Sequence, residues 1–275
     1  MKKILLAIRI KDWWNAIIVP VIAFYFIGLQ YSIGPIEIST ILKVFYLLFL
    51  SISTASFGFY LNELTDIQED TKAGKKNHVI DIPESKRLIT LIIILLFCIM
   101  TSIPFWSNTK IIVLLLVQMI LLSVYSCPPI RLKKSPYIAV ILDSLYSGTI
   151  FFVIALLYSD AVLSSQILIF TITFGLCRGL RNIIFHIDKD IKIDEKAGQK
   201  TIAHITSSEK LYQLQSVLFI LEIAFLLFIL IPISRYTLYI FVLGLIILFV
   251  KWSFYKYYTK DKFFNKKKWL GEINT

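Results

Sequence analysis

Two groups of polar residues in this chain recur every four positions. The first group is Asn62, Asp66 and Asp70, and the second is Asp190 and Asp194. A helix turns once in about 3.6 residues, so a four-residue spacing drifts by only about 40° per step and keeps each group on one helix face. Carboxylate and amide oxygens are ligands of hard cations such as Mg²⁺. Like charges at this spacing repel each other, so we expect a cation to offset them.

The second group extends backwards along the chain at the same spacing. Arg178, Asn182 and His186 precede Asp190 at four-residue intervals. On a single long helix these residues form one polar column. Part of the column falls within an apolar stretch, where ionisable groups are expensive and usually face a cavity. The pattern therefore predicts a polar cavity beside this helix.

Basic residues follow both groups of carboxylates. Mg²⁺ in proteins usually binds one or two carboxylates and completes its shell with phosphate oxygens and water. Lys side chains contribute positive charge to the same phosphates. Two such carboxylate groups predict a site for a diphosphate, with an isoprenoid tail held by the membrane. The basic residues concerned are Lys72, Lys75, Lys76, Lys189, Lys192 and Lys200.

The elements that must position these groups are membrane-spanning helices. The chain is 57% hydrophobic and 17% charged, whereas soluble domains have about 45–50% apolar and about 25% charged residues. This composition excludes a soluble domain and intrinsic disorder, and the three cysteines have no disulfide or zinc spacing. We predict one all-α integral membrane domain over residues 1–275. Its predicted spans are 13–33, 41–61, 88–106, 110–126, 136–158, 163–184, 211–233 and 236–254.

Local signals mark two helix boundaries within this pattern. Pro104 and Asn108 predict a break before the fourth span. The stretch from Thr206 to Glu209 has the spacing of a capping box, which predicts the start of the seventh span.

The distribution of basic residues predicts the orientation of the bundle. When the spans alternate, all of the 29 Lys and Arg residues except Lys43, Lys110 and Arg235 fall on the side of the N-terminus. Cytoplasmic loops carry such an excess, so both termini and the acidic groups are predicted to be cytoplasmic, in a cell membrane of bacterial type. The net charge of +11 therefore reflects topology rather than nucleic-acid binding, and the basic tail 256–275 faces anionic lipid or water.

These motifs together resemble the UbiA superfamily of intramembrane prenyltransferases over roughly residues 5–205. The first family motif matches Asn62, Asp66 and Asp70, and the second matches Asp190, Asp194, Gly198 and Thr201. A connecting motif matches Tyr125–Lys133, and the entry to the first helix resembles the stretch of Arg9, Trp13 and Asn15. The resemblance implies a helical bundle around a central cavity, in which Mg²⁺ holds a prenyl diphosphate and an allylic cation is captured by an acceptor.

The resemblance also implies roles for individual residues. Asp66, Asp70, Asp190 and Asp194 are the expected catalytic metal ligands, with Asn62 as a neutral oxygen ligand. Aromatic faces stabilise a cation, and basic groups stabilise a leaving diphosphate. The expected substrate-binding residues are Arg9, Tyr60, Lys76, Tyr125, Ser126, Arg131, Lys133, Arg181, His186 and Lys200.

The chain departs from the family pattern at several points. Arg9 is followed by Ile10 rather than Pro, Glu63 stands where Asp often follows the Asn, and His78-Val79 stands where Arg-Pro is usual. Eight apolar stretches are found where the family commonly has nine helices. All four motif carboxylates are kept, so the departures concern the acceptor rather than the diphosphate chemistry.

The leading hypothesis is Mg²⁺-dependent transfer of an isoprenoid from its diphosphate to a small, aromatic, quinone-precursor-like acceptor within the bilayer. Two alternatives share the fold: a terpene cyclase that needs no acceptor, and transfer of a phosphoribosyl group to a polyprenyl phosphate. A transporter or channel is disfavoured, because it predicts internal symmetry and charges throughout the membrane depth. The sequence leaves the oligomeric state open.

Overall fold

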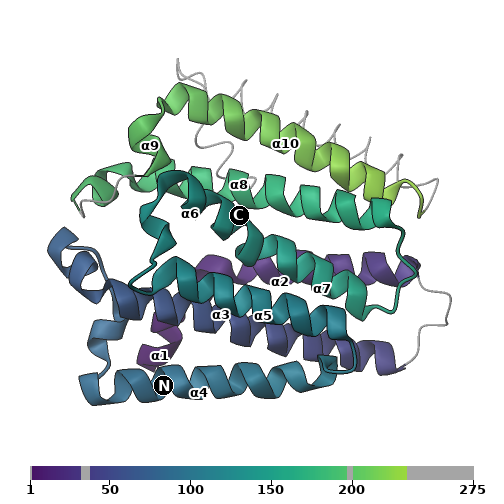
Figure 1. Cartoon of the computed structure of the whole chain (residues 1–275), viewed down its shortest axis with the longest axis horizontal. Helices are drawn as coiled ribbons and strands as arrows, with labels where there is room; N and C mark the ends of the chain where they lie inside the picture. Colours follow the sequence, from purple (N-terminus) through teal and green to yellow (C-terminus); the bar gives the residue numbers. More distant parts are fainter. Residues whose placement is uncertain (1, 32–37, 197–200, 234–275) are drawn as a thin grey trace, which may run out of the picture.

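The computed structural model describes residues 2–31, 38–196 and 201–233, and within 189–196 it describes only the side chains of Ile191 and Glu195. The described residues form helices and connecting loops (Figure 1). The α-helices are α1 (Lys2–Ala7), α2 (Ile10–Gln30), α3 (Ile38–Ala73), α4 (Glu84–Ser102), α5 (Thr109–Ser126), α6 (Pro136–Ser144), α7 (Ile150–Tyr158), α8 (Ser165–Lys196), α9 (Ile202–Ile205) and α10 (Ser208–Leu230). Short 3₁₀ turns are η1 (His78–Asp81), η2 (Ile103–Phe105) and η3 (Leu132–Lys134), and η4 (Leu145–Thr149) is a π-helical turn.

Within the described ranges, seven helical stretches are long and apolar enough to cross a membrane. They coincide with the first seven predicted spans, which confirms the all-helical, multi-pass architecture. Helix α4 shows the outer surface of the bundle, because Leu88, Ile92, Leu96 and Met100 are all exposed. Such an apolar face requires a lipid environment. The predicted eighth span, 236–254, and the tail 256–275 lie outside the described residues.

Two helices are much longer than a bilayer crossing requires. Helix α3 has 36 residues and α8 has 32, whereas about 20 residues suffice to cross the hydrocarbon core. The ends of α3 and α8 that carry the two predicted motifs lie at the same end of the bundle, beside α9 and the starts of α4 and α6 (Figure 1). The fold therefore brings both motif-bearing helix ends together, as the topology predicted.

The fifth span is broken in its middle. Its two α-helical halves, α6 and α7, are joined by the π-helical turn η4. A π turn leaves backbone carbonyls without their usual helical partners. The Thr149 hydroxyl donates to the carbonyl of Ser144 at 2.8 Å, and the Gln118 amide donates to the carbonyl of Tyr146 at 2.9 Å. Side chains thus satisfy the irregular turn inside the bilayer, where water cannot.

The predicted helix boundaries are found with one shift. Asn108 caps α5 by accepting hydrogen bonds from the backbone of Lys110 and Ile111. The cap of α10 is Ser207, which accepts from Lys210, rather than Thr206. The correction has a simple cause, because Thr206 already ends the one-turn helix α9 and only the next residue is available as a cap.

Helix α8 packs directly against the broken span through glycines. A Cβ atom added to Gly179 would lie 2.6 Å from the Cα of Ser144, and one added to Gly175 would lie 2.8 Å from the Cα of Thr149. Backbone atoms cannot yield as a side-chain end can. Close packing of the two helices at this seam therefore depends on the absence of side chains.

Replacing Gly179 with alanine is expected to lower the melting temperature of the purified protein, because it forces α8 away from Ser144; overpacking of this kind costs about 1–3 kcal/mol. Gly58→Ala is the matched control, since its Cβ meets only the flexible end of Leu122. Thermal unfolding in detergent measures both. Equal melting temperatures for the two variants would contradict the close packing of Gly179 against the backbone of Ser144.

Candidate active site

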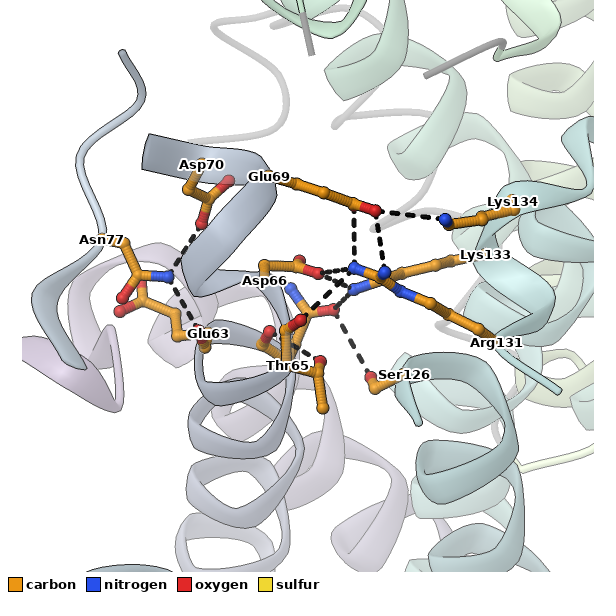
Figure 2. Close-up of polar contacts among 11 residues, drawn as sticks. Glu63, Thr65, Asp66, Glu69, Asp70, Asn77, Ser126, Arg131, Lys133 and Lys134 are labelled. Atoms are coloured by element: carbon orange, nitrogen blue, oxygen red, sulfur yellow. Dashed lines mark hydrogen bonds and ion pairs between the residues drawn. The ribbon is translucent and has the colours of Figure 1, made fainter. Parts of the chain in front are cut away.

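The first motif is held by the loop that follows α5. The Lys133 ammonium donates to Oδ1 of Asn62 at 2.9 Å and also to Oδ1 of Asp66 (Figure 2). Arg131 donates from Nη2 to the same Asp66 oxygen at 2.6 Å. Ser126 Oγ lies 3.4 Å from Asn62 Oδ1. The connecting motif and the first motif therefore form one polar cluster, as the predicted site residues require.

A further acid, Glu69, completes the anchoring of Arg131. Its two carboxylate oxygens accept from Nη1 and Nη2 of Arg131 at 2.7 and 2.8 Å (Figure 2). Lys134 lies 3.1 Å from the same carboxylate. Such two-pronged Arg–carboxylate contacts are strong and directional. Arg131 also has a left-handed backbone, with φ of 43°, which non-glycine residues seldom adopt. Glu69 thus fixes the guanidinium that faces Asp66.

The third member of the first motif points elsewhere. Asp70 accepts a 2.9 Å hydrogen bond from the Asn77 amide, which also donates to the carbonyl of Glu63 at 2.7 Å (Figure 2). The difference from the predicted single face follows from helix geometry, since two steps of about 40° turn Asp70 well away from Asn62. Asp70 therefore ties the loop after α3 to the helix end, beside the cluster of Asn62 and Asp66.

The basic groups of this cluster, Lys133 and Arg131, are largely buried. The Lys133 side chain is only 9% exposed. Loss of hydration lowers its pKa from the usual value, while the Asp66 carboxylate acts in the opposite direction. Within the described part of the chain, Nε of Arg131 is buried and has no hydrogen-bond partner. The cluster thus offers a buried donor to an incoming anion.

Two of the local departures from the family pattern, Glu63 and His78, lie in contact with each other and with Arg9. Glu63 is buried, and its Oε2 accepts from the backbone nitrogen of His78 at 2.9 Å. Its Oε1 lies 3.6 Å from Nδ1 of His78 and 4.0 Å from Nε of Arg9. Arg9 itself has a left-handed backbone and donates to Asp12 at 2.6 Å. The Glu63 carboxylate thus joins the starts of α2 and η1 to α3, next to Asn62.

Two neighbouring cavities open beside the cluster. The first, which we call the motif cavity, has a volume of about 170 Å³ and is lined by Asn62, Asp66, Lys75, Tyr125, Lys133, His186 and Thr201, among others. The second, the arginine cavity, has a volume of about 260 Å³ and is lined by Arg9, Trp13, Lys75, Asp143, Arg178, Asn182 and His186, among others. Lys75 and His186 belong to both walls, so the two cavities are adjacent.

A third cavity extends from the cluster into the bundle. This apolar cavity of about 150 Å³ is lined mainly by apolar and aromatic residues, with Asn62 and Tyr125 at the boundary with the motif cavity. The rings of Tyr125 and Tyr146 meet edge to face at 5.2 Å in its wall. The polar column predicted on α8 is borne out in part, because Arg178, Asn182 and His186 all line the arginine cavity.

Several predicted substrate-binding residues lie away from the cavities. Tyr60 is fully buried and donates to the carbonyl of Arg87 at 3.0 Å. Arg181 is buried and pairs with Glu222 at 2.8 Å. Lys76 is exposed and lines none of the three cavities. Lys200 and the side chains of Asp190 and Asp194 lie outside the described residues.

The structure distinguishes Lys75 within the predicted basic run and adds two residues, Glu69 and Asn77, that the sequence did not single out. Lys75 lines both polar cavities although Lys76 was chosen from the same basic run. Glu69 holds Arg131, and Asn77 holds Asp70. For Glu69 the sequence offered one weak signal, its position beside Asp70 of the first motif. The choice between the adjacent lysines Lys75 and Lys76 depends on the path of the loop backbone, which the sequence pattern does not indicate.

The first motif suits a hard cation. Asn62 and Asp66 already direct two oxygens at one cationic centre, the Lys133 ammonium. An amide and a carboxylate oxygen are also the donors that Mg²⁺ prefers. Among the described residues, no group of three or more His, Cys, Asp and Glu side chains is arranged as a metal site. The second motif, on the part of α8 whose side chains are not described, would have to supply the remaining ligands.

Comparisons with known proteins agree with this architecture. Curated protein sequences give no match. The fold is similar to that of a UbiA homologue from Archaeoglobus fulgidus bound to GPP and Mg²⁺, with a TM-score of 0.69, 20% identity and coverage of 99% of this chain and 95% of that one. The same homologue bound to DMAPP and Mg²⁺ gives a TM-score of 0.67, 18% identity and the same coverage.

A structure from work on digeranylgeranylglyceryl phosphate synthase in membranes gives a TM-score of 0.67 at 17% identity, with coverage of 99% of this chain and 92% of that one. At these identities the structural likeness establishes the fold. The sequence model of the UbiA prenyltransferase family matches residues 18–270, nearly the whole chain. The chain therefore belongs to the UbiA prenyltransferase family.

Proposed function

We propose that this enzyme transfers an isoprenoid chain from a prenyl diphosphate to a small aromatic acceptor of the quinone-precursor type, within a bacterial cell membrane and in the presence of Mg²⁺. The observation that carries the proposal is the motif cavity, whose wall combines Asn62 and Asp66 with Lys75 and Lys133. Relatives of the same fold bind GPP or DMAPP together with Mg²⁺.

The motif cavity suits the diphosphate head. Asn62, Asp66, Asp190 and Asp194 would hold Mg²⁺, which supplies positive charge to the leaving diphosphate, whereas Asp70 bonds to Asn77 beside them. Lys133 and Lys75 line the same wall, and Arg131, which shares an Asp66 oxygen with Lys133, has a buried Nε without a hydrogen-bond partner among the described residues. Preorganised cations directed at the developing charge favour cleavage of the allylic C–O bond. The charge pairs at Asp66 keep Arg131 and Lys133 in place before substrate enters.

The apolar cavity suits the reacting end of the isoprenoid. It begins at Asn62 and Tyr125, where the motif cavity ends. Tyr125 and Tyr146 line it, and the face of an aromatic ring attracts a cation by about 0.5–2 kcal/mol. An allylic cation formed at the boundary would thus lie among aromatic and aliphatic groups that exclude water.

The arginine cavity suits the acceptor. It joins the motif cavity at Lys75 and His186 and the apolar cavity at Phe59 and Asp143. Arg9 and Arg178 give its wall positive charge, while Trp13 offers an aromatic surface. A flat aromatic compound with an acidic substituent matches this wall.

A product panel tests this function and separates it from the terpene cyclase alternative. The purified enzyme is incubated with geranyl diphosphate and Mg²⁺, with or without hydroxylated benzoic and naphthoic acids, and the products are identified by mass spectrometry. We expect a prenylated aromatic acid only when the acid is present. Terpene hydrocarbons or alcohols as the main products in both cases would instead indicate a cyclase.

Removing a carboxylate from either motif is expected to abolish Mg²⁺-dependent release of diphosphate. Asp66→Ala and Asp190→Ala should each lower the rate by more than about 100-fold, since even residues that only support metal ligands contribute roughly 10–100-fold. Asp81→Ala is the matched control, an exposed carboxylate in the loop after α3. A colorimetric phosphate assay with pyrophosphatase reports the rate. Full activity in either motif variant would refute the metal site.

Lys133 and Lys134 provide a test of the buried cation. Lys133→Ala is expected to raise KM for geranyl diphosphate by roughly 10- to 100-fold, the value of a charge-assisted hydrogen bond. Lys134 is 60% exposed and contacts only the outer side of Glu69 in the described structure, so Lys134→Ala should change KM little. Steady-state kinetics at varied geranyl diphosphate distinguishes the two lysines, and equal effects would count against the assignment.

The structure and the sequence pattern favour different lysines, Lys75 and Lys76 respectively, as the contact for the diphosphate. Only Lys75 lines the two polar cavities, and a partly exposed charge contributes up to about 1 kcal/mol. Lys75→Ala should therefore raise KM for geranyl diphosphate by up to roughly 5-fold, and Lys76→Ala by less. The same kinetic assay decides, and a larger effect at Lys76 would support the original choice from the sequence.

A further inference from the structure

Asp143 lies where the apolar cavity and the arginine cavity meet. It belongs to the walls of both, together with Ile17, Phe59 and Ser147. The residue lies in α6, inside the fifth span. An ionisable side chain within a membrane span is costly and usually serves a function. None of the roles assigned above to the diphosphate site uses this carboxylate.

The Asp143 carboxylate has no cationic partner among the residues that the structure describes. Its Oδ1 accepts a 2.7 Å hydrogen bond from the hydroxyl of Tyr146. By contrast Glu222, another acid within a span, is neutralised by Arg178 at 3.2 Å and Arg181 at 2.8 Å. Glu222 thus has a structural explanation in charge pairing, whereas Asp143 is oriented by a neutral donor and left able to take up a proton.

The backbone around Asp143 is irregular but firmly held. The π-helical turn η4 begins two residues later, and such turns inside α-helices occur frequently at functional sites. Thr149 and Gln118 satisfy carbonyls of this turn. Gly179 of α8 packs against Ser144, the next residue in the chain. The turn therefore positions Tyr146 and Asp143 rigidly at the boundary of the two cavities.

We propose that Asp143 is the general base that accepts the proton lost by the acceptor during prenyl transfer. The inference rests on the proposed function, because it assumes an aromatic acceptor in the arginine cavity. The allylic C–O bond breaks and its electron pair leaves with the diphosphate. A ring π-electron pair of the acceptor forms the new C–C bond, and the electron pair of the C–H bond at that carbon restores the ring. The released proton passes to the Asp143 carboxylate.

The position of Asp143 suits this step. The new C–C bond must form where cation and acceptor meet, which is the shared wall of the two cavities. A base must lie within hydrogen-bond reach of the proton that it removes, and Asp143 is the ionisable group on that shared wall. Tyr146 holds one carboxylate oxygen and so presents the group in a fixed orientation.

The test compares Asp143→Asn with Asp160→Asn, using geranyl diphosphate, Mg²⁺ and the aromatic acid that the wild-type enzyme prenylates. Asp160 is an exposed carboxylate that pairs with Lys43 away from the three cavities. It has φ of 58°, which asparagine tolerates, so this variant controls for the chemical change alone. Diphosphate release and prenylated product are measured separately, and Asp143→Glu is tested for rescue.

In Asp143→Asn we expect the prenylated product to fall by about 100-fold or more, the range of general-base catalysis. Diphosphate release and stabilisation by geranyl diphosphate in a thermal-shift assay should persist, with the cation trapped as terpene alcohol. A ring-deuterated acceptor should react more slowly in Asp143→Glu but not in wild type, since proton removal becomes limiting only when the base is displaced. Asp160→Asn should match wild type.

Two results overturn the inference in distinguishable ways. Prenylation at the wild-type rate by Asp143→Asn would refute the base while leaving the proposed function intact. Parallel loss of diphosphate release, substrate stabilisation and product would indicate a structural role. If the wild-type enzyme prenylates no aromatic acid in the panel, the proposed function fails and the inference fails with it.

Discussion

The need to compensate buried charge organises the catalytic end of this protein. A carboxylate in a poorly hydrated environment is stable only when it is paired or hydrogen-bonded, and Asp66 meets this need through Arg131 and Lys133. These two cations come from the loop after α5, while Asp66 lies on α3. The charge pairs therefore fix the distance between two spans and, with it, the opening of the motif cavity. Glu69 extends the same constraint, because it binds the guanidinium of Arg131 that also contacts Asp66.

The same constraint applies to Glu63, a buried acid at one of the departures from the family pattern. Glu63 is a longer acid than the usual aspartate, and it reaches His78 and Arg9 from α3. Each of the three residues lies on a different element, so a change at one alters the partner available to the others. Their contact adjoins Asn62 through the backbone of α3. Variation at this point can thus adjust the arginine cavity, to which Arg9 contributes, while the carboxylates of the diphosphate site are kept.

Sequence reasoning was strongest where the signal is periodic or local. Apolar runs of sufficient length predicted seven spans that the structure describes, and Asn108 was recognised as a boundary because its cap is a contact between neighbouring residues. The four-residue periodicity was less informative about the direction in which each side chain points. It placed Asp70 on the face of Asn62, whereas the accumulated turn of α3 and the Asn77 amide give it another partner.

Other features depend on contacts between distant segments and had no local signal. The choice between Lys75 and Lys76 depends on the path of the loop after α3, and the pairing of Glu63 with His78 depends on that loop folding back onto the helix. Tyr60 was selected because it adjoins the first motif in sequence, but its side chain packs in the core and bonds to Arg87. The irregular turn η4 breaks an apolar run that reads as a continuous helix.

The glycine seam between α8 and the broken span bears on the fidelity of the reaction. Where a methyl group does not fit, at Gly175 and Gly179, a water molecule cannot pass either. Gly175 and Gly179 line the arginine cavity, so backbone packing alone closes this wall of the proposed acceptor site to water. Glycines at these two positions would therefore exclude water from the reaction. A larger side chain that forced the helices apart would admit water and convert the prenyl cation to an alcohol, without altering any group that takes part in the chemistry.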